Sequence, residues 1–200
     1  MLVFGLTGPS GAGKGEVADL FASFDIPVLD ADKIYHRLLL PPSPCLDEIA
    51  HRFGPGVLKP NGTLDRRALS AIVFSDKKEL DELNRITHFY VMGEIRRKLD
   101  AYRNDGISAV ILDAPQLFEA GAEKECNIVV SVLSSRENRI HRILARDGIT
   151  REEAEQRIDA QKSDAFFRAN SDYVIENDRA LDDLRPKVKQ ILLETGVLAP

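Results

Sequence analysis

Apolar residues follow two different spacings along this chain, and the two spacings alternate. Short apolar runs with the length of strands occur at residues 2–6, 26–29, 108–112, 128–133 and 173–175. Between these runs, apolar residues recur every three or four positions, as Val17, Leu20, Phe21 and Phe24 do after the first run. An alternation of strands with helices predicts βαβ units, a parallel sheet and an α/β fold.

The segment between the second and third predicted strands is mostly helical and much longer than a crossover. Helical patterns cover residues 46–53, 66–74 and a long stretch from Lys77. Because connections in compact α/β domains are short, we expect an inserted helical subdomain here. It should project from the edge where the strands end, which is where open sheets bind ligands. A last helix, at about 181–194, should cover one face of the sheet.

A glycine-rich sequence follows the first predicted strand directly. Residues 8–14 read Gly-Pro-Ser-Gly-Ala-Gly-Lys, the pattern of a P-loop, in which backbone N–H groups at a helix N-terminus surround a phosphate. Gly11 and Gly13 let the backbone approach the phosphate oxygens, and Lys14 can reach the β- and γ-phosphates. The alternative is a glycine-rich turn without a ligand. Gly15 stands where Ser or Thr normally offers a hydroxyl to Mg²⁺, so we expect weakened, but not abolished, use of ATP.

Carboxylates end the second and third predicted strands. Asp30 and Asp32 are two residues apart, which directs both side chains to one side near the loop. Asp30 either caps the following helix or faces the acceptor of a phosphoryl group, whereas Asp32 lies beyond the cap position and is the better candidate for accepting a hydroxyl proton. Asp113 ends the third strand, where a Walker-B carboxylate binds Mg²⁺, although Asp is also a common turn residue there. Asp32 and Asp113 are therefore the candidate metal ligands.

Residues 135–147 predict a basic helix, with Arg139, Arg142 and Arg146 at intervals of three and four. Thr150 and Glu153 form a capping box that begins a second helix, so the two helices make a hairpin. In a kinase this hairpin would be a lid whose arginines close over the triphosphate. A solvated amphipathic helix has the same pattern.

Composition limits the remaining classes. The chain has 200 residues, 44% hydrophobic, which is enough for one domain with a full core. A net charge of −5 argues against nonspecific binding to nucleic acids or acidic membranes, and no apolar stretch approaches the length of a membrane span. With no export signal at the start of the sequence, we expect a cytoplasmic protein whose two cysteines, Cys45 and Cys126, are free thiols.

Taken together, these motifs resemble the dephospho-CoA kinase family along nearly the whole chain. The shared motifs, in chain order, are the strand and P-loop at 4–14, Asp30-Ala31-Asp32, residues 62–69 and 83–88, the Pro-Gln-Leu-Phe-Glu at 115–119, the lid residues Arg142, Arg146 and Gln161, and residues 172–177. This chain departs from the family pattern at Gly15, at Gln116, which replaces Leu, and at Phe89, which follows His88 where the family has Pro.

The resemblance implies a single domain built as a three-layer P-loop kinase core with two helical additions. The core comprises 1–31, 105–134 and 168–200, an acceptor-binding subdomain spans about 32–104, and a lid spans about 135–167. It also implies ATP-dependent phosphorylation of the ribose 3′-hydroxyl of dephospho-CoA, giving coenzyme A and ADP with Mg²⁺ as cofactor. The alternatives are another small-molecule or nucleotide P-loop kinase and a catalytically weakened nucleotide-binding protein, because Gly15 replaces Ser or Thr. A homo-oligomer is left open.

The resemblance also assigns roles to individual residues. The catalytic residues are Asp32, Lys14 and Arg142, of which Asp32 is the base. Acceptor binding falls to Asp32, Arg66, Leu83, His88, Leu117 and Gln161. ATP binding falls to Gly8, Gly11, Ala12, Gly13, Lys14, Gly15, Glu16, Arg142, Arg146 and Asn177, the last of which is expected near the adenine.

Overall fold

The computed structural model describes residues 1–178 and 183–199, and these form two units. Unit 1 joins Met1–Leu29 to the chain from Tyr102 onward and contains the sheet. Unit 2 is the intervening segment Asp30–Ala101. The sequence expectation for the inserted subdomain is about 32–104, whereas the contacts of the fold group residues 30–101. No helix in the described part of the chain has the length and apolar character needed to cross a bilayer.

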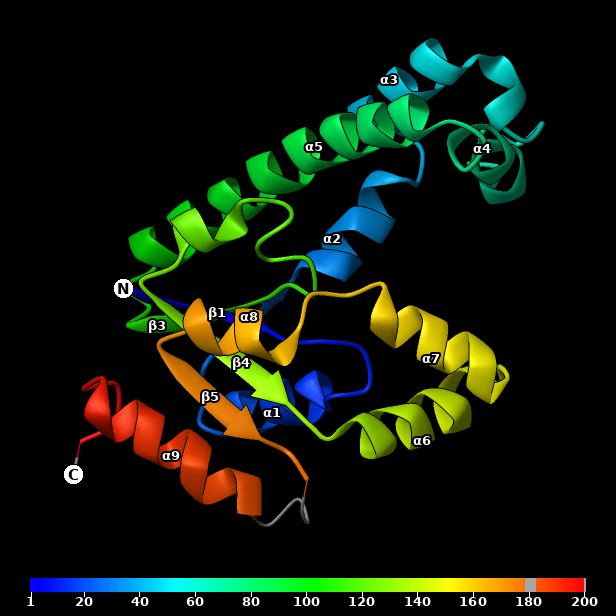
Figure 1. The fold of residues 1–200 in the computed structure, drawn as a ribbon. Coiled ribbons are helices and arrows are strands. Elements are labelled where there is room, and N and C mark those ends of the chain that lie inside the picture. The colour runs from blue at the N-terminus through cyan, green and yellow to red at the C-terminus, as the bar shows by residue number, and fades with distance from the viewer. Residues whose placement is uncertain (179–182, 200) are drawn as a thin grey trace. The chain divides into compact units, whose positions relative to one another are not determined.

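The sheet of unit 1 has five strands in the order β2-β3-β1-β4-β5 (Figure 1). The strands are β1 (Leu2–Thr7), β2 (Val28–Asp30), β3 (Ala109–Asp113), β4 (Ile128–Leu133) and β5 (Tyr173–Glu176). The central strand β1 pairs in parallel with β3 and with β4, and β4 pairs in parallel with β5. All five predicted strands are confirmed. The second begins two residues later than expected, at Val28.

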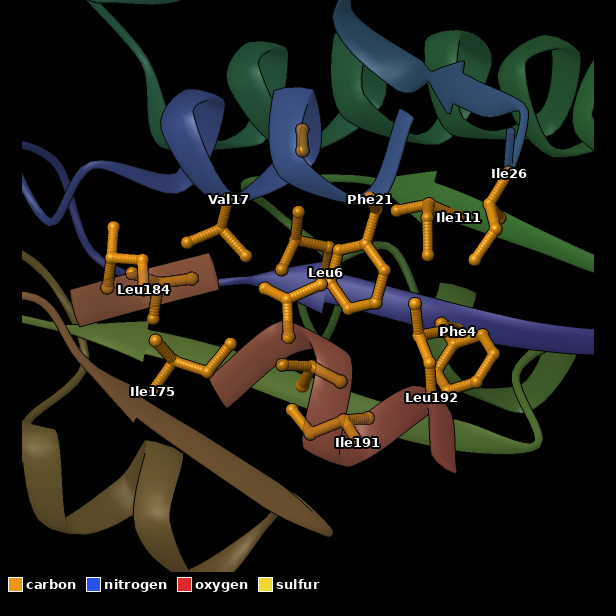
Figure 2. Close-up of a cluster of buried hydrophobic side chains, with 14 of the residues drawn as sticks. Phe4, Leu6, Val17, Phe21, Ile26, Ile111, Ile175, Leu184, Ile191 and Leu192 are labelled. Carbon is orange, nitrogen blue, oxygen red and sulfur yellow. The ribbon is translucent and has the colours of Figure 1, made fainter. Parts of the chain in front are cut away.

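Two helices cover one face of this sheet. They are α1 (Lys14–Ala22) and α9 (Leu184–Glu194); the expected beginning of the last helix, Leu181, lies outside the described residues. Alternate β1 side chains, Phe4 and Leu6, point to this face, where they meet Phe21 from α1 and Leu192 from α9 (Figure 2). All four side chains are fully buried. Burying each of them contributes about 1.5–3 kcal/mol, so this layer fixes α1, and with it the loop that precedes α1, on the sheet.

Shorter segments pack on the opposite face. The chain after β3 forms the 3₁₀ turn η2 (Ala122–Glu125), which contacts β1, and α8 (Asp164–Ala169) contacts β4. Phe118 bridges the two segments through edge-on ring contacts with Phe166, whose ring centroid is 5.1 Å away. Unit 1 therefore has three layers, as the predicted fold requires.

The predicted hairpin is present as α6 (Arg136–Asp147) and α7 (Arg151–Asp159). Gly148 ends α6 in the left-handed conformation, and the Thr150–Glu153 capping box is formed in both directions. The two helices bury a small apolar cluster of their own, made of Ile140, Ile143, Ala154 and Ile158. The hairpin belongs to unit 1.

Unit 2 is helical and has its own core. Its helices are α2 (Ala31–Leu38), α3 (Pro44–Phe53), the 3₁₀ turn η1 (Pro55–Val57), α4 (Arg66–Val73) and α5 (Lys77–Asn104), whose last turn belongs to unit 1. Cys45, Ile49, Val57 and Ile86 are fully buried at the centre of the unit 2 cluster. The helical content and the long helix from Lys77 were both predicted, because the apolar spacing along these segments is strongly periodic.

Candidate active site

The loop between β1 and α1 packs closely against α6 and Asn177. Gly11 and Gly13 have φ values of +79° and +88°. A Cβ at Gly11 would lie 2.6 Å from the carbonyl oxygen of Arg139, and one at Gly13 would lie 2.1 Å from Nδ2 of Asn177. Both positions therefore require glycine for their backbone angles and for the close approach of α6 and Asn177. The loop leads into the N-terminus of α1, where free N–H groups favour a phosphate.

Lys14 forms an ion pair with Asp113. The parallel register of β1 with β3 places Leu6 beside Asp113, the last residue of β3. The carboxylate therefore lies next to the end of β1, the strand that leads into the loop. The two side chains are 16% and 12% exposed. A mostly buried cation and carboxylate at a phosphate-binding loop are suited to a phosphate oxygen and a metal ion, respectively.

Arg142 is bonded to the loop itself. Its Nη1 donates to the carbonyl oxygens of Gly11 and Ala12, each at 3.2 Å, and to Ser134 Oγ at 3.2 Å, and its Nη2 donates to the carbonyl oxygen of Asn177 at 3.0 Å. The guanidinium is thus engaged by protein acceptors.

The side chain of Asn177 is buried against the loop and bonds to it. The residue is 1% exposed, and its Nδ2 donates to the carbonyl oxygen of Ala12 at 2.9 Å and to Glu16 Oε2 at 3.0 Å. Its Oδ1 is buried without a hydrogen-bond partner among the described residues. Asn177 therefore joins the loop and the first turn of α1 to the end of β5. The adenine contact that the family resemblance implies stays a prediction.

Arg146 lies one turn beyond Arg142 in α6. Its side chain is 60% exposed, pairs with Asp147 at 2.7 Å and donates from Nη2 to Ser10 Oγ at 3.4 Å. Hydrogen bonds from Arg146, and next from Arg157, lower the pKa of Asp147 to about 2. Of the two arginines predicted to bind ATP, Arg142 and Arg146, Arg146 is the more exposed.

Comparison with known proteins decides the family. The family model described as dephospho-CoA kinase matches residues 2–183. The dephospho-CoA kinase of Symbiobacterium thermophilum is 40% identical over 189 residues, which cover 94% of this chain and 79% of that protein. The chain belongs to the dephospho-CoA kinase family. The enzyme of the same name from Syntrophotalea carbinolica is 38% identical over 202 residues, covering 100% of this chain and 96% of that protein.

Solved structures agree with the membership. The dephospho-CoA kinase from Campylobacter jejuni superposes with a TM-score of 0.73 at 25% identity over 98% of both chains. The protein TT1252 from Thermus thermophilus superposes with a TM-score of 0.81 at 34% identity, covering 96% of this chain and 97% of that one. Shikimate kinase from Acinetobacter baumannii, with a TM-score of 0.54 at 19% identity over 100% of this chain and 96% of that chain, shares the fold alone. The predicted P-loop kinase fold is confirmed.

Two of the residues expected at the acceptor, Gln161 and Leu117, lie in unit 1. The oxygen Oε1 of Gln161 accepts from the backbone N–H of Ser10 at 3.0 Å and from Arg139 Nη2 at 3.1 Å, so in this structure Gln161 contacts the phosphate loop. Leu117 is fully buried beside Gly5, where a Cβ would lie 3.0 Å from its Cδ2. Its side chain offers no surface to a ligand here.

The remaining acceptor candidates of this dephospho-CoA kinase family member lie in unit 2. Asp30 is the N-cap of α2 and accepts from the Lys33 N–H at 2.9 Å, while Asp32 lies in the first turn of that helix. Arg66 begins α4 and contacts His36 Nδ1 at 3.0 Å. Of the two candidates on α5, Leu83 is 8% exposed and packs in the unit 2 core, and His88 is half-buried. Asp30 is therefore explained by capping, which leaves Asp32 as the carboxylate free of that task.

Two contacts of the site were missed from the sequence. Arg139 is predicted from the sequence only as one of three lid arginines, and its contact with the loop was not foreseen. It is 5% exposed, and burial lowers the pKa of its guanidinium. Asp178 accepts from the Ser135 N–H at 2.7 Å and from Ser134 Oγ at 2.8 Å, and so caps α6 from outside the helix. These hydrogen bonds, that from the Ser135 N–H first, lower its pKa to about 2. No local sequence pattern around Asp178 predicts this cap, because Asp178 is far along the chain from α6.

Proposed function

We propose that this chain transfers the γ-phosphoryl group of ATP to the ribose 3′-hydroxyl of dephospho-CoA, forming coenzyme A and ADP. The observation that carries the proposal is the family match over residues 2–183, which includes the P-loop, the lid and the inserted helices together. The contacts of the loop support the nucleotide half of the reaction, because Lys14 and Asp113 lie where a P-loop enzyme needs a cation and a carboxylate. ATP and dephospho-CoA are the partners that family membership implies.

The chemistry divides among a few side chains. Lys14 and the loop N–H groups hold the phosphates, while Arg146 and Arg142 neutralise charge that develops on the transferred group. The acceptor oxygen forms the new bond to phosphorus, its proton passes to the carboxylate of Asp32, and the bond to the β-phosphate oxygen breaks, leaving ADP. Alignment and charge stabilisation supply most of the acceleration in such reactions, so a single proton acceptor is sufficient.

We propose Mg²⁺ as the cofactor. The described residues contain no group of three or more His, Cys, Asp and Glu side chains suited to a metal ion. Mg²⁺ that arrives with ATP needs no such group, because it keeps several waters and takes its other ligands from phosphates and one or two carboxylates. Asp113, a mostly buried carboxylate at the loop, fits this chemistry in unit 1, and Asp32 is the candidate in unit 2. When bound, the ion would neutralise charge on the phosphates.

The first test is mass-spectrometric detection of coenzyme A after incubation of the protein with ATP, Mg²⁺ and dephospho-CoA. Lys14→Ala should abolish product, and Asp32→Asn should lower turnover at least a hundredfold with little change in ATP affinity. Asp30→Asn is the matched control, because Asn caps a helix as well as Asp does and the same charge is removed two residues away. Near-normal turnover in Asp32→Asn would contradict its role as the base.

An acceptor panel separates the proposed reaction from phosphorylation of another small molecule, since the core and lid are shared by many P-loop kinases. ADP formed with dephospho-CoA and with no other hydroxyl compound supports the proposal. ATP binding without product from any acceptor would instead favour a weakened nucleotide-binding protein. A cytoplasmic location stays a prediction from the sequence.

A further inference from the structure

Side chains of the predicted lid segment bond to both backbone polar groups of Ser10. These side chains are Arg139 in α6 and Gln161 after α7. The backbone N–H of Ser10 donates to Gln161 Oε1 at 3.0 Å, and its carbonyl oxygen accepts from Arg139 Nε at 3.0 Å. Arg139 Nη2 also donates to the same Gln161 oxygen at 3.1 Å. The three residues thus form a closed ring of hydrogen bonds around Ser10, which lies inside the phosphate-binding loop.

Arg139 is an unusual residue to find in this position. Its side chain is only 6% exposed, and the carboxylate that it contacts, Asp164, is 3.4 Å away and itself 45% exposed. Burying a guanidinium beside one partly exposed counter-charge is unfavourable unless its other N–H groups are also bonded. Besides its contact with Asp164, Arg139 donates to Ser10 and Gln161, so the ring around Ser10 supplies two of the hydrogen bonds that compensate for this burial.

The backbone of Arg139 touches the same loop. The closest atom to a Cβ built on Gly11 is the carbonyl oxygen of Arg139, at 2.6 Å. One residue of α6 therefore contacts Gly11 through its main chain and Ser10 through its side chain. Arg142 and Arg146 on the same helix bond to the loop as well, but neither holds a peptide group of Ser10.

We propose that Arg139 is a positioning residue that fixes Ser10 and so raises the affinity of the phosphate loop for ATP, with no effect on the acceptor. This inference rests on the proposed function for the identity of the acceptor only. A loop that is ordered before the nucleotide arrives does not lose that conformational freedom on binding. Loss of the ring should therefore appear in ATP affinity.

The experiment is calorimetric titration of ATP with Mg²⁺ into the full chain without an acceptor. Arg139→Met keeps an unbranched side chain as far as the position of Nε but removes every donor, and we expect the Kd for ATP to rise about tenfold, the effect of losing charged hydrogen bonds. Arg136→Met is the matched control: it removes the same charge one turn earlier in α6, where Arg136 pairs with Asp159, and its Kd should stay within twofold of wild type.

A second variant protects the test against misfolding of the first. Gln161 is exposed, so Gln161→Met removes the shared acceptor without emptying the core, and it should weaken ATP binding about threefold. The double variant should be no weaker than Arg139→Met, because both changes break the same ring. Arg139→Lys, which keeps the charge but only one donor nitrogen, should restore part of the affinity.

Steady-state kinetics completes the comparison. In Arg139→Met we expect the KM for ATP to rise and the KM for dephospho-CoA to stay within twofold. An unchanged Kd for ATP in both Arg139→Met and Gln161→Met, or a fall in melting temperature as the sole effect, would overturn the proposal. Since ATP binding is measured without acceptor, a chain that makes no coenzyme A would refute the proposed function and leave this test intact.

Discussion

Replacing Gly15 by Ser restores the hydroxyl that P-loops normally carry at this position. A Cβ built on Gly15 meets no heavy atom within 4 Å beyond its own helix, and the residue is exposed in the first turn of α1, so Ser fits without moving a neighbour. We expect the hydroxyl to add one oxygen ligand to the Mg²⁺ of Mg-ATP. If that ligand contributes about 1 kcal/mol after displacing a water, the Mg²⁺ concentration for half-maximal activity falls about fivefold.

The substitution also changes helix propensity, and Gly15→Ala controls for that. Ala is about 1 kcal/mol more favourable than Gly within a helix and Ser about half of that, so both variants should melt at a higher temperature than wild type. Only Ser supplies a ligand. The assay is ADP release at fixed ATP with increasing MgCl₂. Equal Mg²⁺ midpoints for the Ser and Ala variants would refute the reasoning, and would show that water replaces the hydroxyl at no cost.

Two further substitutions and one reagent test separate parts of the structure. Gly11→Ala should weaken ATP binding at least tenfold by calorimetry, because the new Cβ would lie 2.6 Å from the Arg139 oxygen at a φ of +79°. Asp178→Ala should cost about 1 kcal/mol in urea unfolding at pH 7. Since folding lowers the pKa of Asp178 from 3.8 to about 2, the carboxylate stabilises the fold above pH 3.8, and the difference from wild type should shrink as the pH falls toward 2. Burial raises the pKa of Cys126 to about 12 and of Cys45 to about 11, so a thiol-specific reagent at pH 8 should label the two cysteines only after unfolding.

Each of these has a contrary outcome. Unchanged ATP affinity in Gly11→Ala would mean that the loop and α6 can separate without cost. An effect of Asp178→Ala that is the same at pH 7 and pH 3 would mean that the cap does not depend on the carboxylate charge. Rapid labelling of the folded protein would mean that the thiols are accessible.

Local patterns predicted most of the secondary structure. The capping box at Thr150 and the left-handed Gly148 are decided by neighbouring residues, and both were recognised. The short helix α8 was not predicted, because six residues are too few for an apolar periodicity to develop. The second strand begins at Val28, beyond Pro27, whose ring nitrogen has no hydrogen to donate to a ladder.

The candidate site was predictable as a set of residues and not as a set of contacts. The spacing of the glycines predicts the phosphate-binding loop, and Lys14 follows these glycines in the sequence. Gln161 contacts Ser10 and Arg142 contacts Asn177, and the two residues of each pair are far apart along the chain. Their contacts depend on how α6 packs, which no local pattern encodes. Arg139 illustrates the difference, since its spacing in α6 matches that of Arg142 and only the structure shows it buried.

The interruption of unit 1 by unit 2 has a consequence for the order of folding during synthesis. Residues 30–101 are contiguous and have their own apolar cluster, so they can fold as soon as they leave the ribosome. The first strand waits much longer, because Leu2 pairs with Ala109 and Phe4 with Ile128. The side chain of Asn177, which bonds the phosphate loop, is made later still. The loop at the beginning of the chain is therefore among the last parts of the nascent protein to acquire its final shape.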